Sequence, residues 1–456
     1  MFKKFTNGCV KLVQKFLPDA FVFCIILTII VFVAAIPVTG MNPIEVAGAW
    51  GKGVWGLLEF SMQMALVLVL GSALANAPAV KGLIRRLAAI PRTAAGSIAF
   101  VTVVAAVCNF INWGFGLIIG ALLAKEVAKR SRSVDYRLII AAAYSGFVVW
   151  HSGISGSIPL GMTSLKDGVV ANTGGALTEI VPVSQTIFAP WNLIMVAVII
   201  AAVAFVNARM HPETKDVVSI DPALLIEEPP KERKKPETVA EKLESSIVLS
   251  YLIVVIGAVY LGYYFIHSGS VLNALSLNIV NLIFLLLGIA FYKTPIGYVQ
   301  AITEAAGSAS GIILQFPFYA GIQGIMVAAG AAGVSLAGAI SNAFVSISTP
   351  RTFPLFCYLA AGIVNFFVPS GGGQWAVQGP IMMPASLALG VSPAVTAMGI
   401  AWGDAWTNML QPFWALPALG IAGLGARDIM GYCAITLIVT GIITALGFLF
   451  LVPMLA

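Results

Sequence analysis

Two stretches of this sequence decide its fold: NFINWGFG (residues 109–116) and PSGGGQ (residues 369–374). Each lies in the middle of an apolar segment long enough to enter a lipid bilayer. Glycine, asparagine and proline interrupt a helix and leave backbone polar groups without partners, which hydrocarbon tolerates only where those groups face a polar cavity. We therefore expect re-entrant hairpins at residues 93–128 and 351–389, each with a broken helix whose tip lines a cavity.

The composition places most of the chain in lipid. Of its 456 residues, 59% are hydrophobic and only 10% are charged, which leaves too few polar residues to cover the surface of a soluble protein. Apolar runs of roughly 20 residues, the length that spans a bilayer, predict an all-α polytopic membrane protein with about nine transmembrane helices besides the two hairpins. The runs are residues 20–38, 57–77, 138–162, 187–208, 247–266, 275–292, 312–332, 394–416 and 429–453.

The basic residues lie between the apolar runs and indicate the orientation. Lys and Arg flank the first hairpin on both sides, and four lysines lie within residues 1–18. Because short cytoplasmic loops are enriched in Lys and Arg, we expect residues 1–18 to be a cytoplasmic amphipathic segment and both ends of the first hairpin to be cytoplasmic. Two short full spans are the alternative to this hairpin. This distribution of Lys and Arg is typical of the loops of a membrane protein and not of a nucleic-acid-binding surface, so no nucleic-acid partner is expected.

The two halves of the chain are similar at a constant offset, which aligns Asn109-Phe110 with Asn365-Phe366 and Trp150 with Trp406. Counting the predicted membrane crossings places the start of the second half on the opposite side of the membrane from the start of the first half. The two repeats are therefore expected to have inverted topology. The predicted organisation is an N-terminal segment (1–18), a first repeat (19–208), a cytoplasmic linker (209–245), a connecting span (246–267) and a second repeat (268–456).

Inverted repeats with interrupted helices are typical of secondary transporters. Two further breaks, WHSGISGS (150–157) and DAWTNMLQP (404–412), follow the two hairpins. Gly and Ser often serve close helix packing, but four breaks in symmetric positions favour a cavity near the bilayer midplane, where helix N-termini suit a carboxylate. The candidate substrate-binding residues are Asn109, Asn112, Trp113, Gly114, Ser152, Ser155, Ser157, Asn365, Ser370, Gly371, Gly372, Gln374, Gln378, Trp406, Thr407, Asn408 and Gln411.

Asp404 is the only carboxylate in the late apolar runs, and an intramembrane acid is a functional candidate by default. We expect it to bind a coupling ion, either Na⁺ or a proton, or to pair with local dipoles, with Asn112, Asn365 and Asn408 as further ion-coupling residues. No other metal and no cofactor is expected, and His151 is expected to be a satisfied lining residue.

No buried Lys or Arg is available to bind the substrate, which predicts a substrate with a single, weakly held carboxylate. The expected walls for a short acyl tail are Trp113, Trp150, Trp375, Trp406 and Trp414.

Several long strings resemble the short-chain fatty acid transporter family, of the acetoacetate and butyrate uptake type, over nearly the whole chain. Among them are NFINWGFGLIIGA (109–121), VNFFVPSGGGQWAVQGP (364–380) and QPFWALPALGIAGLGARDIMGYC (411–433). The family is similar to the ion-transporter superfamily. This resemblance implies short-chain monocarboxylate substrates, elevator-like alternating access and a homodimer in a bacterial inner membrane.

The expected function is therefore cation-coupled secondary transport of a short-chain monocarboxylate. An anion exchanger or a proton-coupled carrier on the same scaffold, and a channel, stay open as alternatives. An enzyme is not expected, because the sequence contains neither an HExxH nor a GxSxG motif and only three histidines.

Overall fold

The computed structural model describes residues 20–163, 166–221, 236–269, 274–365, 368, 370–410 and 413–456. The expected N-terminal segment (1–18) and Gln411 lie outside these ranges. Helices make up most of the described chain, and the one β-contact in it is an isolated bridge between Ala329 and Ser335. The prediction of an all-α protein is confirmed.

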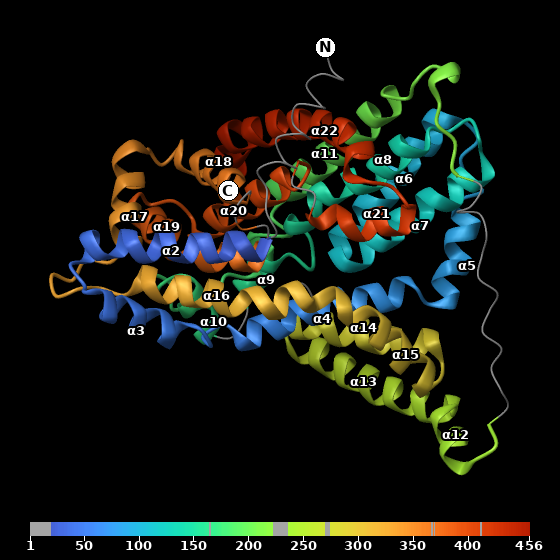
Figure 1. Ribbon diagram of the computed structural model, residues 1–456, viewed down its shortest axis with the longest axis horizontal. Coiled ribbons are helices and arrows are strands. Elements are labelled where there is room, and N and C mark those ends of the chain that lie inside the picture. Colours follow the sequence, from blue (N-terminus) through green and yellow to red (C-terminus); the bar gives the residue numbers. More distant parts are fainter. Residues whose placement is uncertain are drawn as a thin grey trace.

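The helices form two layers (Figure 1). The first layer, along the lower part of the view, contains α2 (Ala20–Thr39), α3 (Pro43–Gly53), α4 (Leu58–Ala75), α13 (Ile247–His267), α14 (Leu277–Tyr292), α15 (Pro295–Ala306) and α16 (Ser310–Val327). The second layer contains α6 (Ala94–Ile111), α7 (Trp113–Arg130), α8 (Tyr136–Ser145), α11 (Pro190–Arg209), α18 (Phe353–Asn365), α19 (Gly371–Ala388), α20 (Pro393–Thr407), α21 (Leu416–Ala422) and α22 (Ala426–Leu446). Contacts of α4 with α7 and of α16 with α19 join the two layers.

Short helices connect the layers and cap their ends. They are α5 (Pro78–Leu87), α9 (Ser157–Gly161), α10 (Lys166–Asn172), α12 (Val239–Glu244), α17 (Leu336–Ile347) and α23 (Val452–Leu455), with 3₁₀ turns η1 (Gly146–Ser152), η2 (Val183–Gln185), η3 (Thr214–Asp216), η5 (Gly307–Ala309) and η6 (Phe413–Ala415) and a π-helical turn η7 (Gly447–Leu451).

Seven helical segments of the described chain are long and apolar enough to cross a membrane. They are Leu58–Ala75, Ala94–Ile111, Tyr136–Gly161, Pro190–Arg209, Ile247–His267, Pro295–Val327 and Ala426–Leu455, and shorter apolar helices lie at Cys24–Thr39, Leu277–Tyr292, Leu336–Ile347 and Phe353–Asn365. Only 6% of α13 is buried, whereas 94% of the best window in Tyr136–Gly161 is buried. The protein therefore spans a membrane several times, with α13 at its lipid-facing edge and the segment Tyr136–Gly161 at its centre.

The first predicted hairpin consists of α6 and α7, which a single residue joins. Thr93 begins α6 by accepting a hydrogen bond from the Gly96 N–H. Asn112 ends α6, since its N–H donates to Cys108 O, and begins α7, since its Oδ1 accepts from the Phe115 N–H at 2.9 Å. An asparagine can fill both positions because its side chain replaces the backbone acceptor that the first turn of a helix lacks.

The second hairpin consists of α18, which ends at Asn365, and α19, which begins at Gly371. A broken helix follows each hairpin. The segment from α8 passes through the 3₁₀ turn η1 before α9 begins at Ser157, and α20 stops at Thr407 before η6 and α21 continue the chain. The helix is therefore interrupted within the predicted break at 150–157. The predicted break at 404–412 begins only after Thr407, and its residues 411–412 lie outside the described ranges.

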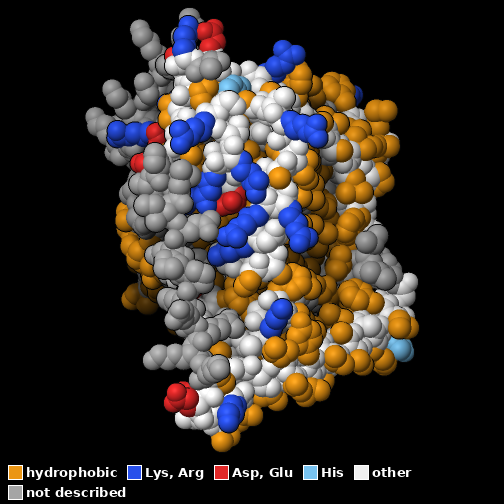
Figure 2. Space-filling model, turned by 90° about the vertical axis from the view of Figure 1, so that its right-hand side faces the viewer, with side chains coloured by type: hydrophobic (Ala, Val, Ile, Leu, Met, Phe, Trp, Pro, Cys, Tyr) orange, Lys and Arg blue, Asp and Glu red, His pale blue; other side chains and the backbone are white. Residues whose placement is uncertain are grey.

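Lys and Arg side chains gather at one end of the molecule, formed by α5 and the turn between α7 and α8 (Figure 2). Arg130 at the end of α7 donates to the backbone oxygen of Arg85 in α5, at 3.2 Å. The basic residues on the two sides of the first hairpin thus lie next to each other in space.

The start of the predicted linker is fixed to the same end through Asp135, which is fully buried. Its carboxylate accepts hydrogen bonds from the N–H groups of Leu138 and Val218, each at 2.9 Å, and lies 3.3 Å from Arg137 Nη2. The Asp135 N–H donates to His211 Nε2 at 3.3 Å. One carboxylate therefore caps α8 and holds residues of the linker at the same time.

Candidate functional site

Two adjoining cavities lie where the two layers meet. The first lies between α4 and α16 on one side and the start of α19 on the other. Met64 of α4 and Ile312 and Phe316 of α16 form its wall on the first layer. Its wall on the second layer consists of Trp113, Trp150, Ser157, Ser370, Gly371, Gly372 and Trp414. The described lining is therefore mostly aromatic and aliphatic, with hydroxyl and glycine groups on one side and no Lys or Arg.

The polar side of this cavity is the N-terminus of α19. Ser370 is its N-cap and accepts a hydrogen bond from the Gly373 N–H at 3.3 Å. The N–H groups of Gly371 and Gly372 occupy the first two helical positions, which have no intrahelical acceptor. These donors and the positive end of the helix dipole suit a carboxylate.

The glycines allow this close approach. A Cβ atom on Gly371 would lie 2.5 Å from His151 Cε1, and one on Gly372 would lie 2.6 Å from the ring of Phe60. Both positions therefore exclude a side chain because neighbouring rings occupy its space.

The second cavity shares Ile312, Phe316, Ser370 and Trp414 with the first. Its further lining residues are Leu68, Ser308, Gly311 and Gln315. The shared residues make it an extension of the first cavity along α16.

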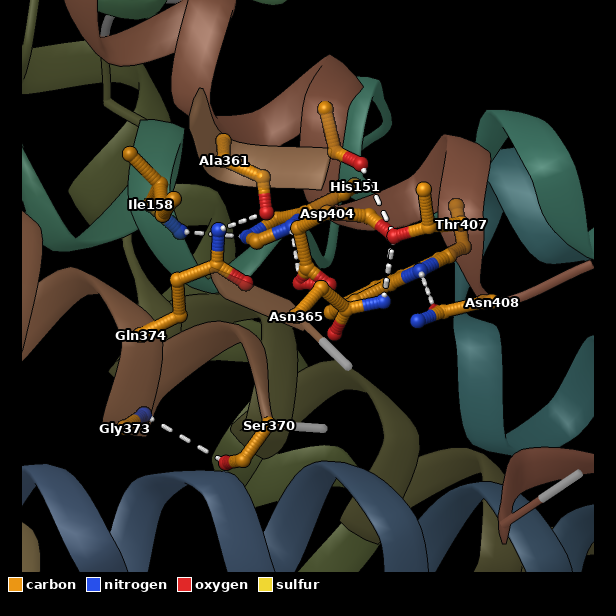
Figure 3. A network of polar contacts seen from close by, with 12 residues as sticks. His151, Ile158, Ala361, Asn365, Ser370, Gly373, Gln374, Asp404, Thr407 and Asn408 are labelled. Atoms are coloured by element: carbon orange, nitrogen blue, oxygen red, sulfur yellow. Dashed lines mark hydrogen bonds and ion pairs between the residues drawn. The ribbon is translucent and has the colours of Figure 1, made fainter. Parts of the chain in front are cut away.

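A buried polar network lies directly behind the N-terminus of α19 (Figure 3). His151 Nδ1 lies 3.2 Å from Asp404 Oδ2, and both side chains are 0% exposed. Asn365 Nδ2 donates to the backbone oxygen of Asp404 at 3.0 Å and to Thr407 Oγ1 at 2.9 Å. The network thereby connects the two broken helices with the end of α18.

The partners of His151 determine where its proton lies. Its Nε2 accepts a hydrogen bond from the Ile158 N–H at 3.1 Å, so this nitrogen carries no proton. The neutral ring therefore has its proton on Nδ1, facing Asp404. The ring of Trp150 stacks on His151 with centroids 4.0 Å apart, and its Nε1 donates to Asn408 Oδ1 at 3.1 Å, which ties the network to the cavity wall.

Two oxygen atoms of this network, Asn365 Oδ1 and Gln374 Oε1, have no hydrogen-bond partner among the described residues, and the Asp404 carboxylate faces His151 Nδ1 through Oδ2. Figure 3 shows the side chains of Asn365 and Gln374 beside Asp404. Because buried polar atoms normally find a partner, this set of acceptors fits a small hard cation or a proton. The described residues bring together no group of three or more His, Cys, Asp or Glu that could hold a metal ion.

The structure divides the predicted site residues into three groups. Trp113, Ser157, Ser370, Gly371 and Gly372 line the first cavity. Asn365, Gln374, Gln378, Asp404, Thr407 and Asn408 lie in the network, where Gln374 Nε2 donates to Gln378 Oε1 at 2.8 Å. The others that the structure describes serve local structure or lie at the first hairpin.

Ser155 Oγ accepts from the Trp113 N–H at 2.9 Å and so completes the start of α7. Ser152 Oγ donates to Val149 O within η1. Trp406 packs away from the cavities, where its Nε1 donates to Leu437 O at 2.7 Å. These three side chains stabilise the breaks and are not part of the lining.

Asn109, Asn112 and Gly114 lie at the α6–α7 hairpin. Asn109 Nδ2 donates to Ala105 O, one turn earlier in its own helix. A Cβ atom on Gly114 would lie 2.9 Å from Leu68 Cα, so Gly114 allows α7 to pack directly on α4. No described hydrogen bond or ion pair joins Asn112 to Asp404, although the sequence groups both as ion-coupling residues.

Of the predicted tryptophan walls, Trp113, Trp150 and Trp414 line a cavity, whereas Trp375 and Trp406 do not. The sequence does not predict the wall on the first layer, which consists of Met64, Leu68, Ser308, Gly311, Ile312, Gln315 and Phe316. Most of these residues lie in α4 and α16, which have no glycine-rich break to mark them. Gln315 and Pro317, a polar residue and a proline inside an apolar run, were the available signals.

Comparisons with known proteins agree with this architecture. A family model described as "Short chain fatty acid transporter" matches residues 1–451. A protein of Escherichia coli (strain K12) named "Putative short-chain fatty acid transporter" is 42% identical over 449 residues, which cover 98% of this chain and 99% of that protein. A protein of the same name from Haemophilus influenzae is 41% identical over 456 residues, covering 99% of this chain and 100% of that protein.

Among solved structures, the crystal structure of the Alcanivorax borkumensis YdaH transporter is similar in fold, with a TM-score of 0.61, 14% sequence identity, and coverage of 95% of this chain and 97% of that chain. With a full-length family match and two full-length relatives above 40% identity, this chain belongs to the short-chain fatty acid transporter family.

Proposed function

We propose that this protein moves a short-chain monocarboxylate across the membrane by cation-coupled secondary transport. The observation that carries the proposal is the first cavity, where the N-terminus of α19 faces aromatic and aliphatic walls. An anion with one charged end and a short apolar tail matches both parts of this lining.

The carboxylate would bind the N–H groups of Gly371 and Gly372 and the hydroxyl groups of Ser157 and Ser370. No Lys or Arg lines the cavities in the described residues. Binding by uncharged donors alone is weak for a polyanion but sufficient for one carboxylate, which a transporter must also release. The tail would lie between Trp113, Trp414 and the apolar side chains of α16.

Alternating access is proposed to arise from movement of the second layer against the first, as in an elevator. Support comes from the position of the cavities, whose walls are divided between α4 and α16 on one side and the hairpins and broken helices on the other. A sliding movement of one layer would carry the N-terminus of α19 past a fixed apolar wall.

The network around Asp404 is the proposed coupling site, for Na⁺ or for a proton. The amide oxygens of Asn365 and Gln374 lack hydrogen-bond partners in the described chain and lie beside the Asp404 carboxylate. A cation there would lie next to the anion bound at Gly371, so each ion would favour binding of the other.

We further propose that the protein functions as a homodimer in a bacterial inner membrane with a cytoplasmic N-terminus. The clustered Lys and Arg side chains at the α5 end support this orientation, because positive residues favour the cytoplasmic side.

Uptake of labelled butyrate into proteoliposomes tests the proposal, with Na⁺ and proton gradients imposed separately. Protein-free liposomes correct for diffusion of the neutral acid. The expected result is accumulation above equilibrium with one gradient, together with counterflow of preloaded butyrate. Counterflow without gradient-driven accumulation would favour an exchanger, and non-saturating flux without counterflow would favour a channel.

A further inference from the structure

The two cavities adjoin one another at Ser370, the N-cap of α19. They share Ile312, Phe316, Ser370 and Trp414. An acid whose carboxylate binds at Gly371 therefore extends its tail past Phe316 toward the second cavity. The residues that only the second cavity has will meet the end of a longer tail.

The residues that line only the second cavity include polar as well as apolar groups. Leu68 and Gly311 continue the apolar wall, but Ser308 and Gln315 add polar groups. Ser308 Oγ donates to Ala305 O at 2.6 Å, so its proton is already used. Gln315 is therefore the residue that presents a polar group, its side-chain amide, to the tail of a substrate in the second cavity.

Gln315 is 6% exposed, and its hydrogen bonds are incomplete. Its Oε1 accepts from Tyr319 Oη at 3.1 Å, which fixes the orientation of the amide. No hydrogen bond from its Nε2 is found within the described parts of the chain, while the side chain lines the second cavity. The amide thus keeps two N–H donors for water in this space.

We propose that Gln315 sets the upper limit of substrate length. This inference rests on the proposed function, since it assumes a carboxylate at α19. A short tail leaves the second cavity to water, which satisfies the Gln315 amide. A longer tail displaces that water and leaves the donors unpaired, a cost that exceeds the gain from burying one more methylene group. Short acids are therefore accepted and longer ones are rejected.

The test compares the double variant Q315L/Y319F with the wild type. Leucine removes the amide, and phenylalanine removes the Tyr319 hydroxyl that would otherwise lose its acceptor. Unlabelled propionate, butyrate, pentanoate and hexanoate, each below its micellar concentration, compete with labelled butyrate for uptake. The double variant should lower the half-inhibiting concentration of hexanoate relative to butyrate by about tenfold or more, the effect of a methylene group in an apolar pocket.

Tyr319→Phe alone is the matched control. It breaks the same hydrogen bond but keeps the amide in the cavity, so its length preference should equal that of the wild type. Should the double variant fail to fold, Gln315→Met replaces it, because methionine has a similar length without an amide. The same ratio of the half-inhibiting concentrations of hexanoate and butyrate is measured for this variant. A double variant or Gln315→Met protein that transports butyrate with an unchanged hexanoate-to-butyrate ratio overturns the inference. Failure of the proposed function looks different, because the wild type itself would then show no saturable butyrate uptake.

Discussion

His151 and Asp404 meet at 3.2 Å between Nδ1 and Oδ2, with both side chains fully buried. They come from the two broken helices of the two halves of the chain. This contact brings a titratable group and an acid next to the proposed carboxylate site, since His151 Cε1 also lies against Gly371.

Asp404→Asn should abolish accumulation of butyrate against a gradient but leave counterflow measurable. The substitution keeps the shape of the side chain and removes the negative charge that would hold the coupling ion. Proteoliposome uptake with an imposed gradient measures the first effect, and exchange without a gradient measures the second. Glu59→Gln, which neutralises an exposed carboxylate on α4, is the control and should accumulate butyrate normally. Full accumulation by Asp404→Asn would refute the role of Asp404.

His151→Phe should lower the stability of the purified protein, because it leaves both Asp404 and the Ile158 N–H without a partner. Removing one member of a buried pair typically costs about 3–5 kcal/mol. The double variant His151→Phe/Asp404→Leu should regain part of the lost Tm, measured by thermal unfolding in detergent, since it also removes the isolated acid. If the two single losses simply add in the double variant, the contact contributes no coupling energy.

Gly371→Ala should reduce butyrate uptake strongly, by about tenfold or more, which corresponds to about 1.4 kcal/mol. The added Cβ would lie 2.5 Å from His151 Cε1 and 2.7 Å from Trp150, so the ring or the start of α19 must shift. Gly51→Ala is the control, because this glycine of α3 has open space around the position of a Cβ atom. Equal uptake by the two variants would show that the start of α19 does not bind the substrate.

Asp135→Ala should release the start of the linker without affecting the cavities. The variant loses the acceptor for the Leu138 and Val218 N–H groups, which at an N-cap costs about 1 kcal/mol. Limited proteolysis should cut near Val218 faster than in the wild type, while the half-saturating butyrate concentration stays the same. Asp135→Asn, which keeps one acceptor oxygen, should show an intermediate rate. A changed butyrate affinity with unchanged proteolysis would contradict this account.

The sequence predicted the features that arise where polar or helix-interrupting residues lie inside an apolar segment. Glycine, asparagine and proline in the middle of apolar segments predicted the interruptions that the structure has after α6, α8, α18 and α20, and Ser370 and Gly371 line a cavity. Such residues are conspicuous because hydrocarbon does not tolerate open backbone groups.

The sequence did not predict relationships that depend on how helices cross. Phe316 and Met64 lie in uninterrupted apolar helices, so nothing distinguishes a cavity-facing side chain from a lipid-facing one. His151 was expected to be a satisfied lining residue, yet only its Nε2 has a backbone donor and its Nδ1 faces Asp404. Asn112 and Asp404 were grouped by residue type, although no described contact joins them.

The one-residue turn at Asn112 has a consequence for how the substrate can be released. Its N–H, Oδ1 and backbone oxygen all take part in holding the ends of α6 and α7, and Gly116 packs against Asn109 so closely that no side chain fits between the arms. Because the turn holds the two helices tightly together, α6 and α7 cannot move apart from each other at the tip of the hairpin. In the proposed transport cycle, the exit for the anion would then be uncovered by parting this rigid unit from its neighbours, and stiffening the tip further would leave the turnover rate unaffected.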